Sequence, residues 1–169
     1  EENEKEKMLL EEENRNGMDE VFPKVNINQV DGKGRTPLSV ASRCGHLDVV
    51  GILLNQTETE GNVIDNDGRT ALFHAVSAGH SNVVSALINQ IETRVDVNAV
   101  NDEGETPLYV ACDQGHFDCV CLLLSARSVL VNVSKNSGAT PLFVACERGH
   151  TDVVRVLLKK RDIKTNIAK

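Results

Sequence analysis

The chain has 169 residues, of which 40% are hydrophobic and only 3% aromatic, and its formal net charge is −7. This length is typical of one domain of roughly 100–200 residues, and a core without Trp must be built from aliphatic side chains, Ala and Cys. No stretch approaches the ~18 consecutive apolar residues of a membrane span, so insertion into a membrane is not expected.

The chain begins with an acidic segment. Residues 1–20 hold nine acids and three bases, so the remaining body is nearly neutral. We expect an acidic N-terminal helix here, and the segment is unlike a secretory signal. A nearly neutral body lacks the field that drives nucleic-acid binding, so DNA and RNA are not expected partners.

The body of the chain repeats one string four times. The string Thr-(Pro/Ala)-Leu occurs at 36–38, 70–72, 106–108 and 140–142, at intervals of 34, 36 and 34 residues. Each copy follows a turn glycine by two residues, and Gly-His comes nine residues after its Thr. The Gly-His pairs are Gly45-His46, Gly79-His80, Gly115-His116 and Gly149-His150. Three markers held in phase over four copies indicate an internal repeat.

Each marker predicts a helix boundary. The Thr hydroxyl caps a helix start, Pro suits the first helical position, and the Gly ends a helix of about two turns. A second helix follows, and its apolar residues at helical spacings of three and four are expected to be its buried side. They are Val49, Val50, Leu53 and Leu54 in the first copy and Val153, Val154, Leu157 and Leu158 in the last. Because such short helices are marginal alone, the pairs must stack on one another.

The pattern D-x-x-G-x-T-P-L-x-x-A-x-x-x-G-H, followed by V-V-x-x-L-L, resembles the ankyrin repeat over nearly the whole chain. The resemblance implies an all-α fold, a solenoid of stacked helix-turn-helix units with β-hairpin or turn fingers. It divides the chain into an acidic helix and degenerate capping repeat at 1–30, and into repeats at 31–64, 65–100, 101–134 and 135–169. The last repeat would include the start of a further finger.

The sequence departs from the family at the position after Thr-Pro-Leu, where His is usual. Ser39, Phe73, Tyr109 and Phe143 stand there, and we expect aromatic packing to replace the His hydrogen bonds in three repeats. The last repeat also keeps the full apolar set of an internal repeat, including Leu158. We therefore expect this chain to be a fragment of a longer protein.

Histidines and cysteines are the residues that suggest chemistry. The four Gly-His histidines lie one per repeat, too far apart to converge on a metal at ~2 Å, and a structural role is expected. His74 replaces a Val of the other repeats, and packing is preferred over a ligand role. The five cysteines lack zinc or disulfide spacing, which favours an intracellular, cytoplasmic location. Cys44 is expected on the binding face, where a reactive role is the alternative, and the other four in or near the core.

No phosphate-binding, serine-hydrolase or zinc-protease string is present, so the chain is not expected to be an enzyme or to hold a cofactor. The leading hypothesis is a monomeric protein-interaction module, a scaffold or adaptor, binding another protein on its concave face. The alternative is a regulatory or structural segment of a larger enzyme or channel, packing against its own chain. The resemblance also makes Asn98 and Asn132 candidates for asparagine hydroxylation.

The finger tips and the exposed ends of the first helices are the expected binding surface. The surface is predicted to be basic at one end and acidic in the middle, so the partner would carry Lys or Arg opposite the third repeat. The candidate residues, with Tyr109 placed near the edge, are Lys33, Arg35, Arg43, Asp67, Arg69, Asp102, Glu103, Glu105, Tyr109, Asp113, Gln114, Glu147 and Arg148.

Overall fold

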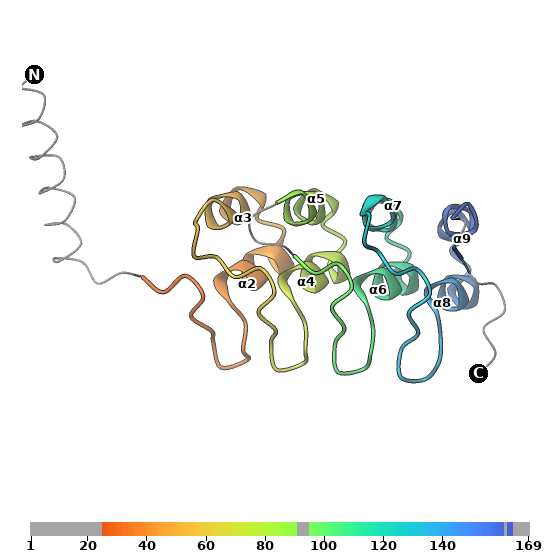
Figure 1. Ribbon diagram of the computed structural model, residues 1–169, viewed down its shortest axis with the longest axis horizontal. Helices are drawn as coiled ribbons and strands as arrows, with labels where there is room; N and C mark the ends of the chain where they lie inside the picture. Colours follow the sequence, from red (N-terminus) through yellow and green to blue (C-terminus); the bar gives the residue numbers. More distant parts are fainter. Residues whose placement is uncertain (1–24, 91–94, 161, 164–169) are drawn as a thin grey trace, which may run out of the picture.

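A computed structural model of the chain describes residues 25–90, 95–160 and 162–163, and within these ranges it contains eight α-helices and no strand (Figure 1). The expected acidic N-terminal helix and the further finger beyond residue 163 lie outside the described residues. The helices are α2 (Pro37–Cys44), α3 (Leu47–Leu54), α4 (Ala71–Ser77), α5 (Ser81–Asn89), α6 (Pro107–Gln114), α7 (Phe117–Ser125), α8 (Pro141–Arg148) and α9 (Thr151–Leu158).

The helices form two rows, with finger turns projecting beyond one of them (Figure 1). The inner row is α2, α4, α6 and α8, and the outer row is α3, α5, α7 and α9. Each inner helix packs on its outer partner and on the next inner helix, so the chain is a solenoid of repeated helix pairs. The expected all-α solenoid of stacked helix pairs is confirmed.

Every inner helix begins at the predicted cap. The hydroxyl oxygens of Thr36, Thr70, Thr106 and Thr140 each accept a hydrogen bond from the backbone N–H three residues on, at 3.1 to 3.2 Å. Three of these helices end at a glycine in the left-handed region, as at Gly45 with φ 74°. The local sequence therefore fixes both ends of three inner helices, whereas in α4 the left-handed Gly79 lies one residue beyond the cap, Ala78.

The core runs along the solenoid between the two rows. Leu72, Leu108 and Leu123 are fully buried, as are Val83 and Val84 of α5. Two residues predicted to be buried are not: Val49 is 46% exposed and Leu158 is 51% exposed. Among the residues that occupy their places in inner repeats, Val83 and Leu124 are buried and Ile88 is partly buried. Their exposure therefore reflects the position of α3 and α9 at the ends of the described stack.

The fingers are tight turns rather than strands. In the first three, an Asp or Asn side chain, such as that of Asp65, accepts hydrogen bonds from the backbone N–H groups two and four residues on. Neighbouring fingers are joined by backbone hydrogen bonds, as from Asn66 N–H to the Lys33 carbonyl at 2.9 Å. The fingers are thus held in a regular row, and their side chains have fixed relative positions.

Candidate functional site

The finger turns and the last turns of α2, α4, α6 and α8 form one surface, which we call the finger face. Two pockets lie on it: the first pocket, of about 540 Å³, between the first two repeats, and the second pocket, of about 440 Å³, between the last two. Of the thirteen candidate residues, five line the first pocket and five the second. The other three, Asp102, Glu103 and Gln114, are exposed and line neither pocket.

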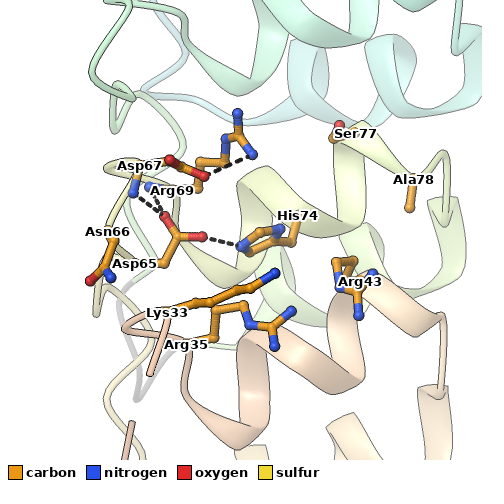
Figure 2. A pocket seen from close by; sticks show the side chains of 10 residues that line it. All are labelled: Lys33, Arg35, Arg43, Asp65, Asn66, Asp67, Arg69, His74, Ser77 and Ala78. Atoms are coloured by element: carbon orange, nitrogen blue, oxygen red, sulfur yellow. Dashed lines mark hydrogen bonds and ion pairs between the residues drawn. The ribbon is translucent and has the colours of Figure 1, made fainter. Parts of the chain in front are cut away.

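The first pocket is lined by four cationic side chains (Figure 2), those of Lys33, Arg35, Arg43 and Arg69. Arg35 donates to Asp31 at 2.6 Å, and this hydrogen bond holds the pKa of the Asp31 carboxyl well below its usual range. Arg69 lies 3.3 Å from the exposed carboxylate of Asp67. Lys33 and Arg43 are exposed and have no ion-pair partner in the described part of the chain.

A buried polar pair forms the wall of this pocket between finger and helix (Figure 2). Asp65 is 8% exposed and His74 is 7% exposed, and the carboxylate lies 2.8 Å from His74 Nε2. Burial lowers the pKa of His74, outweighing the contact with Asp65. Burial alone would raise the pKa of Asp65, but hydrogen bonds from Arg69 N–H, Asp67 N–H and His74 lower it.

His74 was expected to be a packing residue, and its surroundings are instead polar on one side. Because its pKa is lowered, the imidazole is neutral at neutral pH and donates its Nε2 proton to the Asp65 carboxylate. The carboxylate in turn accepts the two backbone N–H groups of its own finger. His74 therefore ties α4 to the second finger, and the hydrogen-bonding capacity of Asp65 is used inside the fold.

In the second pocket, ion pairs join side chains of the third repeat to side chains of the fourth. Lys135 Nζ lies 3.4 Å from Glu105 and 5.3 Å from the centre of the Tyr109 ring. Arg148 Nε lies 2.9 Å from Asp113. The expectation of an acidic middle is therefore wrong for Glu105 and Asp113, whose charges are matched by bases of the fourth repeat. Only Asp102 and Glu103 remain exposed there as acids of the third finger.

Lys135 was missed in the sequence analysis, although a signal for it exists. It stands five residues before Thr140, the place that Asp31 and Asp65 take in the first two repeats. Aligning the four repeats position by position shows this reversal of charge. Because stacked repeats place such positions side by side, the reversal predicts a pair with the preceding repeat.

Tyr109 does not lie near the edge as expected, because it is only 3% exposed. Its ring lies under Lys135 at the bottom of the second pocket, and burial raises the pKa of its hydroxyl. Phe73 is equally buried, whereas Phe143 in the last repeat is 49% exposed. Aromatic packing thus replaces the usual His in the two inner repeats and only partly in the last one.

Two of the Gly-His histidines contact a backbone carbonyl of the preceding repeat. His80 Nε2 lies 3.2 Å from the Arg43 carbonyl, and His150 Nε2 lies 3.0 Å from the Asp113 carbonyl. A Cβ on Gly45 would come within 2.7 Å of the His80 ring, so glycine is required for this contact. The structural role expected of these histidines is confirmed for His80 and His150. Among the described residues, no group of three or more His, Cys, Asp or Glu side chains is placed to hold a metal.

All five cysteines are free. Cys44 is exposed at the end of α2, as expected, and Cys146 is exposed too, although a core or boundary position was expected. Burial raises the pKa of Cys112 to about 12 and that of Cys119 to about 11, so both remain thiols at neutral pH. None of the helices in the described ranges has the length and hydropathy needed to cross a membrane.

Asn98 and Asn132 lie in the segments between α5 and α6 and between α7 and α8, and neither lines a pocket of the finger face. The Asn98 amide donates to the Ser128 carbonyl at 2.8 Å, and the Asn132 amide to the Asp162 carbonyl at 2.6 Å. Each amide therefore joins its loop to the corresponding loop of the next repeat. Hydroxylation of either residue stays a prediction.

A comparison with known families agrees with this geometry. A family model described as ankyrin repeats in three copies matches residues 7–99 and, in a second match, residues 91–168. No curated protein matches the chain. The two matches together span nearly the whole chain and cover both pockets.

Proposed function

Because the chain belongs to the ankyrin-repeat family, whose domains are generally protein-interaction modules, we propose that it is a non-catalytic scaffold or adaptor that binds a partner protein on its finger face. This face would be the concave side of the solenoid. The observation that carries the proposal is the gathering of ten candidate residues from four repeats in two pockets on this one face.

The physical case rests on preorganisation and charge. Cross-finger hydrogen bonds already order the fingers, so binding would cost little conformational entropy there. Complementary charges speed encounter and select partners, whereas aromatic and apolar anchors supply most of the affinity. Phe143, half exposed beside the second pocket, is such an anchor. The exposed acids Asp102 and Glu103 would face Lys or Arg of the partner.

The proposal is tested by affinity capture from cell lysate with three forms of the chain. The variant Asp102→Lys/Glu103→Lys changes the third finger, and Glu58→Lys/Glu60→Lys makes the same change of charge in the loop after α3. We expect the native form and the loop variant to recover the same partner and the finger variant to lose it, with unchanged circular dichroism. Recovery of that partner by the finger variant, or its loss from both variants alike, would contradict binding at the fingers.

Exposed apolar side chains favour a second candidate function. Phe143 and Leu158, at 49% and 51% exposure, lie at the α8–α9 end of the described stack. A regulatory or structural segment would bury this end against more of its own protein. The double variant Phe143→Ser/Leu158→Ser should then abolish self-association of the native chain in sedimentation velocity experiments. A native chain that stays monomeric at high concentration would speak against this candidate.

A further inference from the structure

The first pocket holds more cationic side chains than the neighbouring carboxylates can neutralise by ion pairing. Lys33 from the first finger and Arg43 from the last turn of α2 have no ion-pair partner among the described residues. Lys33 extends from the first finger toward His74, with Arg35 beside it, and Arg43 lies at the end of α2 (Figure 2). The Arg69 guanidinium lies beside Asp67, on the other side of Asp65. Like charges that converge repel one another unless an anion enters between them.

The three carboxylates nearby do not neutralise Lys33 and Arg43. Asp31 is engaged by Arg35, and Asp65 is buried against His74 and its own finger. Asp67 contacts Arg69 only at 3.3 Å, with the two side chains 65% and 39% exposed. Exposed pairs of this kind contribute little, so Arg69 can exchange Asp67 for another acceptor. Its buried Nε also has no acceptor in the part of the chain that the structure describes.

A comparison of equivalent positions in the repeats explains why Arg43 is unpaired. In the second pocket, Asp113 of one repeat meets Arg148 of the next. The residues in those two places in the first pocket are Arg43 and Ala78, and both line it. Alanine offers no charge, so the first pocket stays open for a group that comes from outside.

We propose that the first pocket binds a carboxylate side chain, Asp or Glu, of an extended acidic segment of a partner protein. The proposal deepens the function proposed above and rests on it. Lys33 and Arg43 would bind the carboxylate, with Arg69 as a third donor. Asp65 and Asp67 in the same wall favour a singly charged carboxylate over a phosphate group, whose charge of nearly −2 they would repel more strongly.

The partner's orientation follows from the difference between the two pockets. In the second pocket, Glu105 and Asp113 are paired with bases of the fourth repeat, and Glu147 is the one lining charge without an ion-pair partner among the described residues, so this pocket does not attract an acid. An acidic group would therefore lie over the first two repeats, and a basic group beside Asp102 and Glu103 of the third finger. One extended segment can satisfy both conditions only in one direction along the fingers.

The test uses defined peptides and amide chemical shifts of the whole chain. The probes are acetylated, amidated heptapeptides of sequence Gly-Ser-Glu-Asp-Glu-Ser-Gly, the same peptide with Gln and Asn for its acids, and one with a central phosphoserine as its only acidic residue. We expect the acidic peptide to shift the amides of residues 33–35, 43–44 and 66–69, and the neutral peptide to leave them unchanged. Equal shifts with the neutral peptide, or stronger binding of the phosphoserine peptide, would overturn the carboxylate assignment.

Matched variants locate the binding. Lys33→Glu/Arg43→Glu should weaken the acidic peptide at least tenfold, whereas Arg155→Glu/Lys159→Glu, with the same charge change on exposed residues of the α9 end, should not. Equal weakening by both would show a non-specific charge effect and reject the pocket. In the capture experiment, a partner lost by the third-finger variant but kept by Lys33→Glu/Arg43→Glu would leave the proposed function standing and reject this inference. Peptide binding at the pocket without any captured partner would show that the pocket accepts a carboxylate and would count against the proposed function.

Discussion

The first and second pockets are built on the same frame of the repeat and use charge in opposite ways. In the second pocket, each acid of the third repeat meets a base of the fourth, as Glu105 meets Lys135. In the first pocket the corresponding places hold Arg35 and Asp65, and Asp65 is already bound to His74. Together with Arg43 and Ala78 in place of Asp113 and Arg148, four equivalent positions differ between the pockets, two in each repeat of a pair. These differences decide whether a pocket has its own ion pairs or is left open to a partner.

Removing the buried pair Asp65–His74 of the first pocket should have the largest effect on stability. Asp65→Ala removes a buried carboxylate that accepts three hydrogen bonds, and we expect a loss of about 2–4 kcal/mol in the free energy of unfolding. Asn101→Ala in the third finger removes a neutral acceptor of two backbone hydrogen bonds, together with the hydrogen bond that its amide donates to Glu105, and should cost about 1–2 kcal/mol. Urea unfolding measures both. Equal losses would mean that the contact with His74 adds nothing, and the two pockets would then differ less than we infer.

The next effect is a pH dependence that belongs to the first pocket alone. The pKa of His74 is lowered by burial, so below its ordinary value near 6.5 the unfolded chain binds the proton more readily than the folded one. Stability should therefore fall as the pH drops from 7 to 5, by at most about 1.4 kcal/mol per pH unit for this one group. The lowered pKa of Asp65 adds a loss at more acidic pH.

The matched variant is His74→Val, which places the residue of Val110 and Val144 in the second repeat. It should flatten the dependence of unfolding free energy on pH between 7 and 5, whatever its effect on stability at pH 7. Urea unfolding at several pH values measures the two slopes. An unchanged slope in His74→Val would assign the pH dependence to other groups.

Much of this architecture could be predicted because it depends on order along one repeat. The Thr caps, the glycine helix ends and the inner positions of Leu72 and Leu108 follow from local spacing. The sequence analysis missed the contact of Lys135 with Glu105 and the burial of Tyr109. Both features depend on residues about 30 positions apart in the chain. They depend on which side chains adjacent repeats bring together, so only a comparison of equivalent positions, or the structure itself, shows them.

The coupling energy of the ion pairs should also differ between the two pockets, by less than the effects above. Lys135 and Glu105 are 28% and 18% exposed, and Lys135 also lies over the Tyr109 ring, so a double-mutant cycle with alanine should give a coupling of about 1 kcal/mol. The Arg69–Asp67 pair is more exposed and should give less than about 0.5 kcal/mol. Equal couplings would show that Arg69 is not free to leave Asp67, which would remove it as a donor in the first pocket.

The smallest effect on stability should come from closing the first pocket by design. Ala78→Glu places an acid where the fourth repeat has Arg148, next to a repeat that offers Arg43 in place of Asp113. Ala78 is exposed and has helical backbone angles, so glutamate fits there and the free energy of unfolding should change by less than about 0.5 kcal/mol. The new carboxylate should pair with Arg43, as Arg148 does with Asp113.

Binding of the acidic peptide should then fall severalfold, because the pocket would contain its own anion. Ala78→Gln, of the same size and without the charge, should bind the peptide as the native chain does. Chemical-shift titration of the two variants separates charge from shape. If the glutamine variant weakens binding as much as the glutamate variant, the pocket discriminates by size, and unpaired charge is not what distinguishes it from the second pocket.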